Sequence, residues 1–201
     1  MQRFRVFVLA GILSAASLGA GAQTVTLSGG KLKALDNIDT LNIVFDYSKL
    51  TVGEEGKEAN YIKRKKAELD KKEEGRGDKW EQAWLGDRQA HYEPKFIETF
   101  NANAKGLVLV QDSSKPLTMV YKVLFIEPGY NVGISRKNAS ANGEAWVINP
   151  AEPKKALVKF RVMDAPGGSF FRTDFDAAGR ITTTFVNAAK GLAKQLSKDK
   201  K

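Results

Sequence analysis

One stretch of the chain, residues 117–126, constrains the fold more than any other. Alternate residues of a strand share a face, and one face here is wholly apolar, carrying Leu117, Met119, Tyr121, Val123 and Phe125. The other face is mostly apolar too and is interrupted by Thr118 and Lys122. Such a strand is typical of the centre of a sheet, where other elements cover it above and below. Pro128-Gly129, just beyond it, predicts a type II turn.

Residues 1–22 have the features of a secretory signal peptide. Arg3 and Arg5 precede an apolar run, and the small residues Ala20 and Ala22 stand at the −3 and −1 positions of a cleavage site. The apolar run is shorter than the about 20 residues that a membrane span needs, and no stop-transfer pattern follows it. We therefore expect cleavage after Ala22, no transmembrane span in the mature chain, and export to the periplasm or the cell exterior.

The chain contains no cysteine. Lipid attachment at a cysteine, disulfides and thiolate metal sites are therefore excluded, and the protein is not expected to be a lipoprotein. A mature chain of about 180 residues is long enough to be held by a hydrophobic core alone. Cleavage would remove two arginines from a formal net charge of +9, which leaves the chain basic. A basic surface favours anionic partners, and outside the cytoplasm envelope glycolipid or cell-wall polymer is a better candidate than nucleic acid.

The remaining pattern predicts the α/β (α+β) fold class. Alternating residues predict strands, with a small edge strand allowed at 24–27, and the predicted strands are 41–47, 107–110, 117–126, 138–149 and 156–163. Helical periodicity and composition predict helices at residues 57–73, 79–101 and 172–196. Hairpin-length connections imply antiparallel neighbours, and the helical crossover after the first strand allows one parallel pair.

These elements predict a single mixed, mostly antiparallel sheet of about five strands with helices packed against it. No linker or internal repeat divides the chain. We therefore expect one domain over residues 23–197, followed by a frayed basic tail at residues 198–201.

Three local signals refine the helices. Asp78 stands three residues before Glu81, the spacing of a capping box, and predicts a helix N-terminus at that point. Pro94 either begins a second helix in its first turn or kinks a continuous one. Apolar residues recur at three- and four-residue steps in the last predicted helix, with Thr173 or Asp174 as its cap. This helix is therefore expected to cover the sheet.

Segments spread over most of the mature chain carry a family resemblance. They are residues 41–48, 77–80 with Trp84, Asp87 and Arg88, 92–96, 100–101, 127–129, 174–176 and 180–181. In these segments the chain resembles a family of uncharacterised secreted proteins of Bacteroidota, which implies export but no particular activity. In element order it is also similar to small envelope domains of outer-membrane lipoprotein activators of cell-wall synthases and of the curli secretion lipoprotein. It departs from those in lacking the lipidated cysteine.

The first functional hypothesis is a secreted cell-envelope protein with a non-catalytic binding or interaction domain. Trp80, Trp84, Arg88, His91 and Tyr92 lie close together in one helical region, and interface hot spots favour aromatic and arginine residues. The partner would be an envelope protein, a glycan or an anionic lipid surface. The alternative interpretation is that Trp80 and Trp84 pack on the sheet.

The second hypothesis is a carboxylate-dependent hydrolase that acts on an envelope substrate. Paired acids can divide acid and base roles, and the candidates are Asp46, Glu93, Asp174 and Asp176. His91 is the only histidine, so a histidine-rich metal site or a Ser/His/Asp triad would depend on it. We predict no catalytic residue, metal ligand or cofactor. The basic run at residues 63–66 is interpreted as a solvated helix face and not as a nucleic-acid site.

Overall fold

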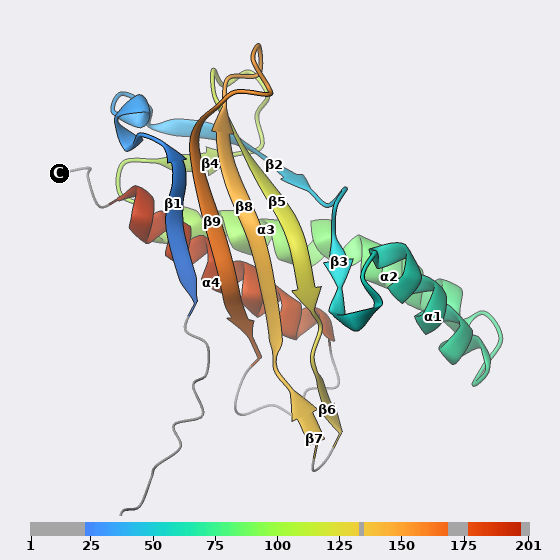
Figure 1. The fold of residues 1–201 in the computed structure, drawn as a ribbon. Helices are drawn as coiled ribbons and strands as arrows, with labels where there is room; N and C mark the ends of the chain where they lie inside the picture. Colours follow the sequence, from blue (N-terminus) through green and yellow to red (C-terminus); the bar gives the residue numbers. More distant parts are fainter. Residues whose placement is uncertain (1–22, 133–134, 169–176, 198–201) are drawn as a thin grey trace, which may run out of the picture.

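The computed structural model describes residues 23–132, 135–168 and 177–197, and its main feature is a seven-stranded mixed sheet. The strands run in the order β1-β9-β8-β5-β2-β4, and β3 pairs with the end of β5 (Figure 1). Their bounds are β1 Thr24–Gly30, β2 Thr40–Asp46, β3 Thr51–Val52, β4 Val108–Val110, β5 Thr118–Glu127, β8 Ala139–Ile148 and β9 Ala156–Gly167. A separate two-stranded sheet is formed by β6 Tyr130–Val132 and β7 Ser135–Lys137.

The predicted fold class is confirmed, although the sheet has seven strands where about five were expected. The two additional strands are β1, which runs to Gly30, and β3, which lies in a segment expected to be a loop. β1 contains the edge strand allowed at residues 24–27 and extends it through backbone hydrogen bonding to β9. β3 is two residues long, too short to show side-chain alternation, and is placed by its pairing with β5.

The sheet also contains more parallel pairing than the one pair that was allowed. β2 is parallel to both β4 and β5, and β3 is parallel to β5. The strands β5, β8, β9 and β1 are antiparallel in succession. The helices between β3 and β4 carry the chain back to the same end of the sheet, which is why β4 and β5 both run in the direction of β2.

In the described part of the chain four α-helices accompany the sheet, and they are α1 Glu58–Asp70, α2 Arg76–Asp87, α3 Glu93–Asn103 and α4 Ala177–Leu196. Short helical turns occur at η1 Leu32–Leu35 and η2 Gly53–Glu55, and α2 continues into α3 through a π-helical turn, η3 Arg88–Tyr92. The helix predicted at residues 79–101 is therefore two helices. Pro94 lies in the first turn of α3. Of the two alternatives expected, the one in which Pro94 begins a second helix is therefore confirmed.

The predicted cap at Asp78 is wrong. α2 begins at Arg76, so Asp78 lies inside its first turn. The Asp78 carboxylate instead pairs with the Lys66 ammonium of α1 at 2.7 Å, an interaction between helices that a local capping pattern cannot show. The cap proposed at Thr173 or Asp174, the signal peptide and the tail at residues 198–201 lie outside the described residues.

The long helix α4 packs on the sheet as predicted. Its apolar stripe is buried, and the stripe consists of Ile181, Phe185, Ala188, Ala189, Leu192 and Leu196. The Arg180 guanidinium, near the beginning of α4, donates to the carbonyl oxygens of Pro128 at 3.0 Å and Gly129 at 3.2 Å. This charged side chain is buried but satisfied, and it joins α4 to the turn at the end of β5.

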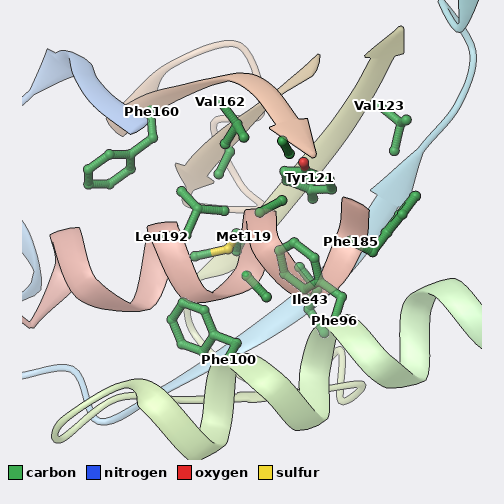
Figure 2. Close-up of a cluster of buried hydrophobic side chains, with 14 of the residues drawn as sticks. Ile43, Phe96, Phe100, Met119, Tyr121, Val123, Phe160, Val162, Phe185 and Leu192 are labelled. Atoms are coloured by element: carbon green, nitrogen blue, oxygen red, sulfur yellow. The ribbon is translucent and has the colours of Figure 1, made fainter. Parts of the chain in front are cut away.

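The centre of the core is a group of rings between the sheet and two helices (Figure 2). Tyr121 of β5 lies 4.6 Å from Phe96 of α3 and 6.2 Å from Phe185 of α4, measured between ring centroids. Phe45 of β2 meets Phe96 edge-on at 5.3 Å. Because β5 contributes Met119, Tyr121 and Val123 to this side, the stretch that first indicated a core does form its floor.

The other side of the sheet is not covered as expected. α3 and α4 both lie behind the sheet in Figure 1, and α1 and α2 lie beside it, beyond β3. Val44 on the opposite side is 46% exposed. We call that side the open face, and its residues include Val44, Asp46, Val120, Lys122, Glu144, Trp146, Lys159 and Arg161. Long neighbouring side chains shield part of its apolar residues from water. The apolar sequence pattern therefore predicted a covered face where no helix covers it.

Phe96→Ala is expected to lower the free energy of unfolding by about 3–5 kcal/mol. Phe96 is 0% exposed and its ring packs between Phe45 and Tyr121, so truncation leaves a cavity. Denaturant unfolding measures the loss. Leu85→Ala is the control, because Leu85 is 41% exposed on α2, and it should change stability by less than about 1 kcal/mol. Equal stability of the two variants would contradict this core.

Candidate functional site

The two tryptophans predicted to bind a partner pack against α1. The Trp84 side chain is buried, and its indole Nε1 donates to Glu58 Oε1 at 2.7 Å. Trp80 is half-buried and stacks on Trp84 with ring centroids 5.6 Å apart. Tyr61 of α1 contacts both rings. The alternative that they pack on the sheet is therefore corrected: their partner is another helix, and they join α2 to α1.

The other predicted binding residues point in different directions. Arg88 forms an ion pair with Glu58 at 2.5 Å, and its guanidinium lies 4.3 Å from the centroid of the Tyr47 ring. Tyr92 is buried and stacks on Phe185 at 5.1 Å. His91 is exposed, with Nε2 3.7 Å from the Asp87 carboxylate.

The helical region therefore brings Trp84 and Arg88 together on Glu58, stacks Trp80 on Trp84, and sends Tyr92 into the core and His91 into solvent. The π-helical turn causes part of this divergence, since its wider spacing rotates the residues that follow it. Of the five residues, all but His91 pack between elements in the structure.

The described carboxylate candidates lie on opposite sides of the sheet. Phe45 faces the helices, where it contacts Phe96, so the next residue, Asp46, faces the open side. Glu93 is in the first turn of α3, on the helical side. Hydrogen bonding from Ser48 holds the pKa of Asp46 below its usual value. Burial raises the pKa of Glu93 above its usual value.

The opposite pKa shifts of Asp46 and Glu93 would suit an acid and a base, but the sheet separates the two carboxyl groups. The remaining candidates, Asp174 and Asp176, lie outside the described residues.

A surface pocket of about 250 Å³ lies where η2 and α1 meet the end of β5 and the β6–β7 pair. Two of its three carboxylates are paired with basic groups of the same pocket. Glu127 pairs with Lys137 at 2.7 Å, and Arg64 pairs with Glu55. The third, Glu54, is 95% exposed and lies 3.9 Å from Lys137. Two unpaired acids are therefore not brought together in this pocket.

The open face carries a tryptophan between two lysines. The ammonium groups of Lys122 and Lys159 lie 3.3 Å and 3.9 Å from the centroid of the Trp146 ring. The indole Nε1 donates to Glu144 Oε2 at 2.9 Å, and Glu144 Oε1 lies 3.7 Å from the Arg161 guanidinium. Cation–π contacts and a satisfied indole N–H hold this large ring in one orientation.

Two cross-strand rows make up the centre of this surface. In one row Lys159, Trp146, Val120 and Val44 are successive partners on β9, β8, β5 and β2. In the next row Arg161, Glu144, Lys122 and Asp46 are partners on the same four strands. An aromatic and aliphatic row thus lies beside a charged row, on a side of the sheet that no described helix covers.

This surface was not predicted from the sequence. Glu144 and Trp146 stand two residues apart in the strand predicted at residues 138–149, and Lys122 interrupts the apolar pattern of residues 117–126. Those were the available signals. What was lacking was the register between strands, because Lys122, Glu144 and Lys159 gather around one ring only through pairing across β5, β8 and β9.

No family model and no curated protein matches this chain. Among solved structures it is similar to the PelC dodecamer from Paraburkholderia phytofirmans, with 11% identity, a TM-score of 0.40, and coverage of 84% of this chain and 97% of that chain. A variant PelC dodecamer from the same organism gives 12% identity, a TM-score of 0.36, and coverage of 83% and 97%.

Among residues 23–132, 135–168 and 177–197, no helix is both long and apolar enough to cross a bilayer. Within the same residues, no three His, Asp or Glu side chains are grouped so that they could hold a metal ion.

Glu93→Gln is expected to raise the melting temperature at pH 7. Burial raises the folded pKa of Glu93 above 4.5, so the folded chain holds this proton more tightly than the unfolded chain. Stability contributed by the protonated form is then lost as pH rises through the folded pKa. Glutamine carries no titrating proton and avoids that loss. In thermal melts from pH 4 to pH 7, the melting temperature of Glu93→Gln relative to the unchanged protein should therefore rise with pH.

Glu98→Gln is the matched control for this prediction, because Glu98 is an exposed residue of the same helix and pairs with Lys95. Its melting temperature relative to the unchanged protein should not depend on pH in this way. A Glu93→Gln variant that melts below the unchanged protein at pH 7 would show that ionised Glu93 stabilises the fold.

Proposed function

We propose that the protein is an exported, non-catalytic binding domain of the cell envelope, and that its partner binds to the open face. The observation that carries the proposal is Trp146, held between Lys122 and Lys159 on a sheet side that no described helix covers. A large, rigid aromatic ring loses little conformational freedom on binding, and such rings serve as anchors of interfaces.

The surroundings of Trp146 support binding at this surface. Val44, two strands away in the same cross-strand row, is 46% exposed, so a partner could remove apolar area from water. The charged row next to it would supply orientation and specificity. Three of the charged side chains around the ring are basic, which agrees with a partner from the envelope that presents anionic groups.

Two observations favour a binding role over catalysis. In the surface pocket, Glu127 and Glu55 are each paired with a basic group, so two free acids do not meet there. The two described carboxylate candidates, Asp46 and Glu93, lie on opposite sides of the sheet. Hydrolysis by paired carboxylates would need two acids on the same side of a cleft.

Export is proposed from the N-terminal sequence, with its two arginines, apolar run and small residues before Gln23. The absence of cysteine favours a protein without a lipid anchor. The partner classes are an envelope protein, a glycan or an anionic lipid surface, and nucleic acid is not among them.

Photo-cross-linking in the native host tests the binding surface. A photo-reactive phenylalanine analogue replaces Val44 on the open face or, as control, the exposed Gln89 of η3 on the helical side. We expect a discrete adduct from position 44, none from position 89, and loss of the adduct when Trp146→Ala is added. Adducts from both positions, or from neither, would refute the open face as binding surface.

Export predicts a specific mature N-terminus. The protein recovered from an envelope or medium fraction of the native host should begin at Gln23, as determined by mass spectrometry of its N-terminal peptide. An Ala22→Tyr variant, which places a bulky residue at the −1 position, should retain the uncleaved chain. Recovery of the full chain with Met1 from the cytoplasmic fraction would contradict export.

A further inference from the structure

Four charged side chains of alternating sign cross the open face in one row. The row runs from Arg161 on β9 through Glu144 on β8 and Lys122 on β5 to Asp46 on β2, and each residue is the cross-strand partner of the next. Its ends, Arg161 and Asp46, are separated by three strand spacings, about 14 Å. They therefore do not contact each other within one chain.

Read in the opposite direction, this row has the opposite sign at every position, so two copies of it can pair. The pairing requires a twofold axis that runs parallel to the strands and lies between β8 and β5. When a second copy faces the first about this axis, each charge meets an opposite charge. Arg161 then faces the second copy's Asp46, and Glu144 faces the second copy's Lys122. An axis perpendicular to the strands would instead oppose like charges, which is costly at an interface. Twofold dimers of this self-complementary kind are the commonest oligomers.

The same rotation also brings the apolar groups of the aromatic row of the two copies into contact. Lys159, Trp146, Val120 and Val44 occupy the same four strands in the same order. The rotation places Trp146 against the second copy's Val120, and the aliphatic stem of Lys159 against the second copy's Val44. The axis chosen from the charges alone is therefore also compatible with the aromatic row.

We propose that the open face is the interface of a homodimer, in which a second copy of this chain docks face to face about a twofold axis along the strands. The inference rests on the proposed function, because it names the partner of that binding surface. Face-to-face sheets commonly pack about 10 Å apart with their strands within about 30° of each other, which is the arrangement that this rotation produces.

The size of the surface determines how strong the dimer should be. Four strands and about three rows of side chains cover roughly 400 Å² on each copy. A standard stable interface buries about 800 Å² per partner. The dimer is therefore expected to be weak and to depend on protein concentration.

The alternating row also has a role within the chain, since opposite charges on neighbouring strands stabilise a sheet. The contact between Arg161 and Glu144 is of this kind. That role involves adjacent strands only and makes no link between Arg161 and Asp46. An experiment on these two ends of the row therefore separates the dimer from stabilisation of the sheet.

Sedimentation equilibrium of the purified mature chain tests the dimer at concentrations up to about 1 mM. We expect the unchanged protein to dimerise, and Arg161→Glu or Asp46→Arg alone to weaken the dimer roughly tenfold or more, because like charges then meet at both ends. An equal mixture of the two variants should restore it, since each new charge faces its opposite. Lys79→Glu on the exposed surface of α2 is the control and should change nothing.

The mixture distinguishes the dimer from a folding defect, because damage within each chain cannot be repaired by another damaged chain. Circular dichroism melts establish that each variant is folded. If charge reversal unfolds the chain, Arg161→Gln and Asp46→Asn take its place, and each should weaken the dimer and lessen its salt dependence. A monomer at all concentrations, or no restoration in the mixture, overturns the homodimer.

The two proposals can fail separately. A photo-cross-linked adduct from position 44 with a different molecule, together with a monomeric purified protein, would keep the open face as a binding surface and reject the second copy as its partner. A homodimer adduct that disappears with Arg161→Glu would support both. An absence of any adduct from position 44 would reject the binding surface itself.

Discussion

The structure depends on the ring cluster that fixes two helices to one side of the sheet. Tyr121 at the middle of β5 contacts Phe96 of α3 and Phe185 of α4, and Phe45 of the neighbouring strand closes the group. These rings come from four elements that are far apart in sequence. Their burial orders the helices relative to the sheet and, through the Arg180 contacts to the turn after β5, the end of the central strand as well.

Covering one side of the sheet decides the character of the other. With α3 and α4 behind the sheet, the opposite side faces solvent and must be compatible with water. The chain meets this requirement with long charged side chains laid over apolar ones, as in the two lysines on Trp146. The result is a flat surface that combines a rigid ring, aliphatic groups and ordered charges. Those are the properties on which the proposed function and the homodimer interface are based.

The helical region shows how much the role of an aromatic residue depends on what packs against it. Trp80 and Trp84 were grouped with Arg88, His91 and Tyr92 because they follow one another closely. In the structure a half-buried carboxylate, Glu58, binds the Trp84 indole and the Arg88 guanidinium together. Glu58 lies on α1, 26 residues from Trp84 and 30 from Arg88 in sequence, and its pattern there is that of an ordinary charged helix residue. Only the packing of α1 on α2 makes it the centre of that cluster.

The sequence by itself determined the fold class, the central strand, the position of most helices and strands, and the burial of the α4 stripe, because these follow from local periodicity. It also indicated correctly that Pro94 lies at a helix boundary, since proline acts on its own turn. Tertiary structure alone decided that β1 and β3 join the sheet, that Asp78 pairs with Lys66, and that Trp146 lies between Lys122 and Lys159. These features depend on which strand lies beside which, and in what register. That choice is made by the packing of the whole core, so no local stretch of sequence contains it.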